Sequence, residues 1–148
     1  MIGRGALIKP WIFQEIREKR DLLPTTDERL EIYLQFAALL LEHFGDDDYG
    51  QRSARNFFAW HCDFFYRYHP LPESEYRAAS REHPLIQTRL SSPPTEDPVA
   101  QALADSNQNT HKELARLVVQ CRTEQHDVAW LREQISQLYH SSQAEVVD

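Results

Sequence analysis

Residues 25–45 read TTDERLEIYLQFAALLLEHFG, and this stretch decides the fold class. Thr25 and Glu28 have the spacing of a capping box, in which two side chains satisfy free N–H groups at the start of a helix. Apolar residues then recur every three or four positions and form one helix face: Leu30, Tyr33, Leu34, Ala37, Leu40, Leu41 and Phe44. A second apolar face is formed by Ile32, Phe36 and Leu39. The stretch predicts a long helix at the centre of a helical bundle, with Gly45 as its C-terminal cap.

Helices are also predicted on both sides of this stretch. Residues 51–148 contain no glycine, so turns with positive φ should be scarce there. We expect helices over residues 11–20, from about residue 51 to residue 68, and over residues 73–81. In the second of these, one stripe of rings has helical spacing and favours core packing over base stacking: Phe57, Phe58, His61, Phe65 and Tyr68. Two rings fall outside that stripe and are candidates for the surface: Trp60 and Tyr66.

The C-terminal region carries a seam of apolar residues at alternating steps of three and four: Leu114, Leu117, Cys121, Val128, Leu131, Ile135 and Leu138. Glu124 interrupts this seam, so the region is expected to form either one long helix or a helical hairpin. A polar residue at such a position weakens a coiled coil. We therefore expect the seam to dock on the bundle of its own chain, and the protein to be a monomer.

The N-terminus has a different pattern. Met1 and Ile2, followed by Gly3-Arg4-Gly5, predict the end of a strand that runs into a turn. No other segment reads as a partner for that strand, which suggests a fragment or a gene model begun at an internal methionine. Backbone N–H groups and a guanidinium in such a turn suit a phosphate, although an ordinary turn has the same three residues.

Composition and charge limit the possible functions. Apolar residues make up 41% of the chain and charged residues 26%, as in folded soluble proteins. The net charge of −7 gives no global attraction for nucleic acid, so any RNA contact must use a local basic face. Cys62 and Cys121 are too few for a disulfide framework and lack zinc-site spacing, which indicates a reducing compartment. No membrane segment is predicted, and neither the seven histidines nor the run Asp46-Asp47-Asp48 has the spacing of a metal site.

A series of motifs resembles the tRNA-dihydrouridine synthases, and it extends over roughly residues 1–70. Its members occur in the family's order: Met1 to Leu7, Lys9 to Phe13, Glu15-Ile16, Glu28-Arg29-Leu30, Leu41 to Asp46, Gly50, Arg55, Phe57, Phe58, Trp60, Arg67, Tyr68 and Pro70. Two of these, Lys9-Pro10-Trp11 and the Leu-Glu-His-Phe-Gly stretch that ends at Gly45, are similar to the eukaryote-type branch, which acts on the tRNA variable loop. The resemblance implies an all-α helical bundle preceded by the final strand end and phosphate-binding turn of a truncated TIM (β/α)8 barrel.

The resemblance also implies a chemistry, in which FMN, reduced by NADPH, delivers hydride to uracil while a cysteine acts as general acid. That cysteine lies upstream of this sequence in the family, and neither Cys62 nor Cys121 matches its motif. Both cysteines are interpreted as small packing residues, and no catalytic residue is predicted in this chain. Gly3 and Arg4 match the turn that holds the FMN phosphate.

The family uses the helical domain to hold tRNA, which makes three basic residues candidates for RNA contact: Arg52, Arg55 and Arg67. Many members have a second basic residue and a histidine directly after the position of Arg55, whereas this chain has Asn56 and Phe57. A solvated face that forms surface ion pairs is an equally good interpretation of the three arginines.

The resulting organisation has four parts, comprising a barrel edge at 1–23, a helical domain of the tRNA-binding type at 24–90, a linker at 91–97 and a divergent helical tail at 98–148. The function implied is reduction of uridine to dihydrouridine in tRNA, in the cytoplasm or in the nucleus of a eukaryote, with this chain inactive by itself. One alternative is a stand-alone helical module that binds RNA or protein. Another is a structural protein that associates through the 114–138 seam.

Overall fold

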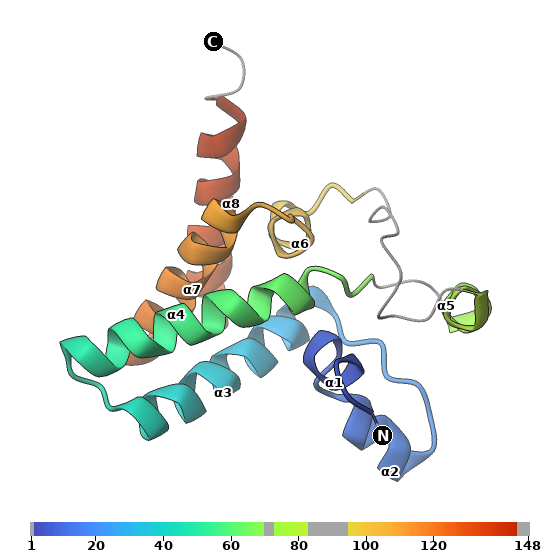
Figure 1. Ribbon diagram of the computed structural model, residues 1–148. Coiled ribbons are helices and arrows are strands. Elements are labelled where there is room, and N and C mark those ends of the chain that lie inside the picture. The colour runs from blue at the N-terminus through green and yellow to red at the C-terminus, as the bar shows by residue number, and fades with distance from the viewer. Residues whose placement is uncertain (1, 70–72, 83–94, 145–148) are drawn as a thin grey trace.

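A computed structural model describes residues 2–69, 73–82 and 95–144, and every regular element in these ranges is a helix. The helices follow one another along the chain as α1 (Gly5–Ile8), α2 (Ile12–Glu18), α3 (Thr26–Phe44), α4 (Asp48–Phe65), α5 (Glu73–Glu82), α6 (Pro98–Leu103), α7 (Gln108–Thr123) and α8 (Val128–Ala144). Helices α3 and α4 form an antiparallel hairpin, α7 packs against both, and α1 and α2 lie at one end of the hairpin (Figure 1). The predicted all-helical bundle is confirmed for these residues.

The ends of α3 and α4 are fixed by side-chain caps and a tight loop. The Thr25 Oγ1 accepts a hydrogen bond from the Glu28 backbone N–H at 3.2 Å, as the capping-box spacing predicted. Gly45, with φ of 94°, caps the other end of α3, and Asp47 caps α4 by accepting from the Gly50 N–H at 2.7 Å. A Cβ on Gly50 would collide with the carbonyl oxygen of Gly45, so the chain approaches itself closely at this loop. Because Asp47 provides the cap, α4 begins three residues before the predicted start at Gln51.

The main core lies where α3, α4 and α7 meet. Rings from α3 and α4 interlock there, with Tyr33 stacked on Phe65 at 4.5 Å between centroids and Phe58 edge-on to Tyr33 at 6.3 Å. Leu131 and Ile135 of α8 are fully buried in the same core. The core therefore joins residues from both sides of the proposed 91–97 linker, and the apolar seam docks within the chain as predicted.

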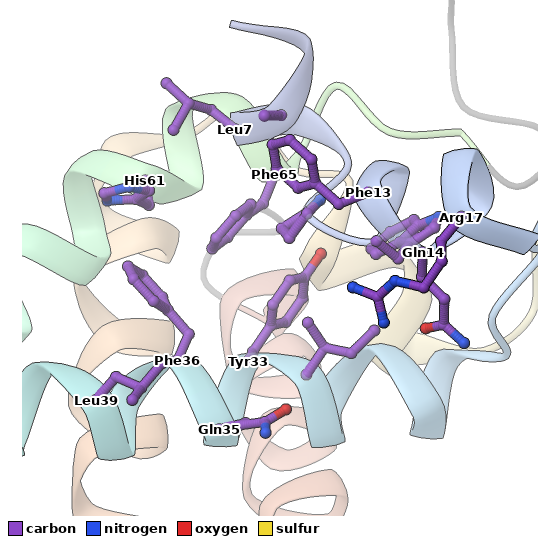
Figure 2. Close-up of a pocket in the computed structure, with 14 residues that line it drawn as sticks. Leu7, Phe13, Gln14, Arg17, Tyr33, Gln35, Phe36, Leu39, His61 and Phe65 are labelled. Carbon is purple, nitrogen blue, oxygen red and sulfur yellow. The ribbon is translucent and has the colours of Figure 1, made fainter. Parts of the chain in front are cut away.

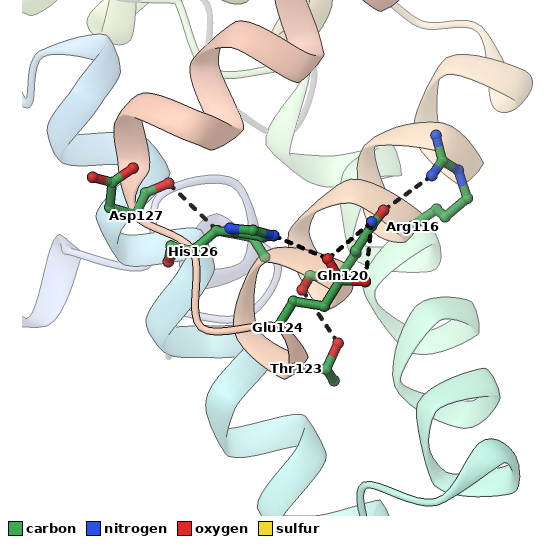
Figure 3. A network of polar contacts seen from close by, with 7 residues as sticks. Arg116, Gln120, Thr123, Glu124, His126 and Asp127 are labelled. Atoms are coloured by element: carbon green, nitrogen blue, oxygen red, sulfur yellow. Dashed lines mark hydrogen bonds and ion pairs between the residues drawn. The ribbon is translucent and has the colours of Figure 1, made fainter.

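Helices α7 and α8 form the helical hairpin that was one of the two expectations for the C-terminal region (Figure 1). Glu124, the residue that interrupts the seam, caps α7, and Gln125 turns the chain with a φ of 58°. The Glu124 carboxylate accepts hydrogen bonds from Gln120 at 3.2 Å and from His126 at 2.9 Å, and both bonds lower its pKa (Figure 3). A glutamate that looked like a defect in a coiled coil thus organises the turn.

Two expectations for the N-terminal half are wrong. Ile2 lies in no strand, and the described residues contain none, because the short helix α1 begins directly after the Gly3-Arg4 turn. Phe57 and Leu39 were assigned to the interior, yet 44% and 59% of their surface is exposed. In the described residues no helix covers the face of the α3–α4 hairpin on which they lie.

No described helix is both long enough and apolar enough to cross a bilayer.

Candidate functional site

The motif residues near the N-terminus build a buried corner between α1 and α2. Lys9 and Glu15 are 5% and 8% exposed, and the Lys9 Nζ lies 2.5 Å from a carboxylate oxygen of Glu15. The other carboxylate oxygen accepts the Leu22 backbone N–H at 2.8 Å. Trp11 packs edge-on against Tyr68 at 4.7 Å, which docks the corner on the end of α4. These residues of the resemblance thus have a structural role, because they hold the Gly3-Arg4 turn against the bundle.

The candidate phosphate turn lies at the surface, next to this corner. Gly3 has a φ of 57°, which favours glycine, and the turn closes through a hydrogen bond from the Ala6 N–H to the Gly3 carbonyl at 3.2 Å. The Arg4 side chain is exposed and has no ion pair or hydrogen bond with a described residue. A Cβ at Gly3 would meet nothing within 4 Å, so the turn is open on the side from which a ligand would approach. A guanidinium beside such a turn is chemically suited to a phosphate.

The three candidate RNA-contacting arginines lie on α4 and directly after it. Arg52 is exposed and Arg55, one turn further, is half-buried, and neither pairs with a carboxylate in the described part of the chain. Arg67 follows the end of α4, where its guanidinium lies 5.4 Å from the Phe64 ring. Fifteen residues separate Arg52 from Arg67, or roughly 20 Å along a helix. The structure thus presents an extended row of cations, which differs from a compact anion site.

Asp63, which lies four residues before Arg67, is engaged by α7. Asp63 accepts hydrogen bonds from the His111 Nδ1 at 2.9 Å and from the Gln108 side chain at 2.6 Å, both on α7. His111 is buried, and its Nε2 donates to the Asp105 carbonyl at 2.7 Å. This network fixes α7 against α4.

Sequence reasoning missed a groove that lies between the α1–α2 corner and the α3–α4 hairpin. Its volume is about 660 Å³, and Figure 2 shows side chains from all four helices around it. Its walls are mainly aromatic and aliphatic: Leu7, Trp11, Phe13, Ile32, Tyr33, Phe36, Leu39 and Phe65. Gln14, Gln35 and His61 add polar edges, and Arg17 is the one charged side chain in the lining. The second apolar face of α3 is the only sequence signal that pointed to this groove.

His61 sits at the edge of the groove among aromatic rings. Its Nδ1–H donates to the Phe57 carbonyl at 3.0 Å, and its ring centroid lies 4.7 Å from that of Phe36. Burial lowers the pKa of His61 below its ordinary value, an effect that the hydrogen bond to Phe57 opposes. The ring is therefore best suited to the neutral form, with Nε2 as a hydrogen-bond acceptor.

The cysteines have the packing positions expected of them, and one of the three consecutive aspartates caps a helix. Cys62 and Cys121 are both buried and free of disulfides. Burial raises the pKa of the Cys62 thiol far above its ordinary range and that of Cys121 to about 11, so neither is activated as a thiolate. Asp47 serves as the cap of α4. The described residues contain no group of three metal-ligating side chains.

Comparison with known proteins gave a consistent set of relatives for about half of the chain. A tRNA-dihydrouridine(47) synthase of Saccharomyces cerevisiae is 46% identical over 71 residues, which cover 48% of this chain and 11% of the yeast protein. The synthase of Scheffersomyces stipitis is 48% identical over 71 residues, and that of Yarrowia lipolytica is 42% identical over 79 residues. The match covers 12% and 13% of these two relatives. No family model and no solved structure matches.

Proposed function

We propose that the chain is a C-terminal portion of a tRNA-dihydrouridine synthase, because about half of it is similar to enzymes of that family. The whole protein would be an FMN-dependent oxidoreductase that reduces uridine to dihydrouridine in tRNA with NADPH. The observation that carries this proposal is the identity of 42–48% over 71–79 residues with proteins named tRNA-dihydrouridine(47) synthase [NAD(P)(+)]. The chain spans only 11–13% of those relatives, so most of the enzyme's machinery lies in residues that it does not match.

Within that enzyme, the residues of this chain would bind and position. Gly3 and Arg4 would contact the FMN phosphate, which is supported by the left-handed Gly3, the open space beside it and the exposed guanidinium. FMN, when bound, supplies the hydride. The buried Lys9–Glu15 pair would keep this turn in place against the helical bundle.

The helical bundle would hold tRNA through phosphate contacts. Arg52 and Arg55 present their charges on α4 and Arg67 presents its charge directly after it, and the carboxylate of Asp63 is engaged by α7. Phosphate contacts position a nucleic acid without reading its sequence. The overall charge of −7 opposes binding, so the local row of cations must carry it. A monomer in the cytoplasm or nucleus, where tRNA is modified, fits this role.

A chimera provides the test of this binding role. Residues 1–70 replace the matching segment of the Saccharomyces cerevisiae enzyme, and affinity for unmodified tRNA is measured at several salt concentrations. Arg52→Ala with Arg55→Ala should weaken binding to different tRNAs alike and lower the salt slope by about one unit per arginine. Arg20→Ala, which removes an exposed cation that pairs with Glu18, is the matched control. Equal affinity and slope for the double variant and the parent, with unchanged circular dichroism, would leave the arginines as surface residues.

A stand-alone helical module that binds RNA or protein is the second candidate. It is supported by the core, which α3, α4, α6, α7 and α8 complete without any contribution from a barrel. The two candidates differ in what else the protein must contain. Only the first requires this chain to be joined to a flavin-binding barrel.

A further inference from the structure

We propose that the groove between α2 and α3 binds one unpaired nucleotide of RNA, with the base on its aromatic wall and the phosphate at Arg17. This inference rests on the proposed function, because it assumes that RNA is the partner. None of the three arginines on and after α4 lines this groove.

The shape and the wall of the groove suit a planar ring. A volume of about 660 Å³ falls in the range of small-ligand sites, roughly 300 to 1,000 Å³. Phe13 of α2 and Leu39 of α3 both line the groove while 54% and 59% of their surface is exposed (Figure 2). Phe36 is held in place by His61 at 4.7 Å and Phe65 at 6.1 Å between centroids. Unpaired bases stack on such exposed aromatic surfaces in RNA-binding proteins.

The charges and polar groups of the groove favour an anion with a hydrogen-bonding edge. The chain has 23 acidic residues, yet none of them lines the groove, and Arg17 is its one charged side chain. Arg17 is exposed and forms no ion pair or hydrogen bond with a described residue, although its charge helps to lower the pKa of the neighbouring Glu18. Glu18, its acidic neighbour on α2, accepts from Gln14 at 3.1 Å and pairs with Arg20 at 2.8 Å. Gln35 has no hydrogen-bond partner among the described residues, so its amide is available to a base edge.

An apolar protein segment would fit this groove less well than a nucleotide. It would cover Arg17 and the Gln35 amide without satisfying either, and burial of unpaired polar groups is costly. A nucleotide offers a phosphate for the first, a base edge for the second and a ring for the aromatic wall.

Binding of a fluorescein-labelled oligouridylate to the 148-residue chain tests the proposal. The folded chain should bind it saturably, and Phe13→Ala and Arg17→Ala should each weaken binding roughly tenfold. Tyr49→Ala, which removes an aromatic ring that is 74% exposed elsewhere on the surface, and Arg122→Ala, which removes an exposed cation, are matched controls that should change affinity less than about twofold. An abasic oligonucleotide of equal charge should bind much more weakly.

Three results would overturn the proposal: no saturable binding by the folded chain, equal effects of the groove and control variants, or equal affinity for the abasic strand. Formation of dihydrouridine by the chimera, measured separately, distinguishes this failure from failure of the proposed function. If the chimera is active but its Phe13→Ala and Arg17→Ala variants bind RNA normally, the groove proposal is wrong and the proposed function stands. If binding depends on the groove residues but the chimera is inactive, the nucleotide site is supported and the proposed enzyme function is not.

Discussion

Lys9 and Glu15 illustrate how single residues support the proposed site from below the surface. Their ion pair is almost completely buried, and Glu15 also accepts the Leu22 N–H, so the carboxylate is doubly compensated. Removing one member of a buried pair leaves an uncompensated charge, which costs more than the pair itself contributes. The Gly3-Arg4 turn therefore keeps its position only while both members of the pair are present.

Lys9→Met should lower the free energy of unfolding by about 3 kcal/mol, because the buried carboxylate of Glu15 loses its cation. The control is Glu18→Gln, at an exposed residue that pairs with Arg20, where solvent screens both charges and the loss should be much smaller. Urea denaturation followed by circular dichroism measures both. Equal losses for the two variants would contradict the structural role assigned to the buried pair.

His61 should make the stability of the chain depend on pH. Its pKa in the folded state lies below the ordinary 6.5, so the unfolded state binds more protons between these two values. The free energy of unfolding should therefore fall as the pH drops through 6.5, and stop falling below the folded-state pKa. His61→Gln should remove this part of the slope. Parallel pH profiles for wild type and variant would show that the environment of His61 has no effect on its protonation.

The helices illustrate what the sequence predicts well. Capping residues and the apolar period are local signals. They therefore predicted three helix boundaries: the Thr25–Glu28 cap, the Gly45 end of α3 and the break at Glu124. The period also showed that α3 has two apolar faces. It could not show which face is covered, because that depends on how residues 19–25 return the chain from α2 to α3. Leu39 and Phe57 were misplaced for this reason, and the groove was missed.

Buried charges escaped prediction for a related reason. Arg29 is 2% exposed, with its guanidinium 4.9 Å from the Tyr68 ring and hydrogen-bonded to the Tyr33 hydroxyl at 3.2 Å. A charged residue on a helix is expected at the surface unless its partners are known. Those partners come from α3 itself and from the residues after α4, and only the folded chain brings them together.

Helix α8 should be an integral part of the bundle. Leu131 is fully buried, so Leu131→Ala should lower the free energy of unfolding by roughly 2 to 5 kcal/mol. Leu39→Ala, at a leucine that is 59% exposed, removes the same atoms and should cost less than about 1 kcal/mol. Chemical denaturation measures both, and sedimentation equilibrium should report a monomer. A concentration-dependent dimer that dissociates on Leu131→Ala would instead assign the seam to self-association.

The whole chain should be colourless and catalytically silent when isolated. Gly3 and Arg4 offer one edge of a cofactor site, and Cys62 and Cys121 are buried thiols whose raised pKa disfavours proton transfer. Absorbance of the purified chain after addition and removal of free FMN measures retention. Stoichiometric flavin, or dihydrouridine formed from tRNA and NADPH by this chain alone, would show that these residues do more than bind and position.

Function of the chimera in cells tests the central claim most directly. Yeast that lacks its own tRNA-dihydrouridine(47) synthase would express the chimera with residues 1–70, and dihydrouridine in its tRNA would be measured by mass spectrometry. Because 71 residues of this chain are 46% identical to the yeast enzyme, the chimera should restore dihydrouridine to a level near that of the parent. A chimera that accumulates and binds flavin like the parent, yet forms no dihydrouridine, would contradict the assignment of this chain to a working tRNA-dihydrouridine synthase.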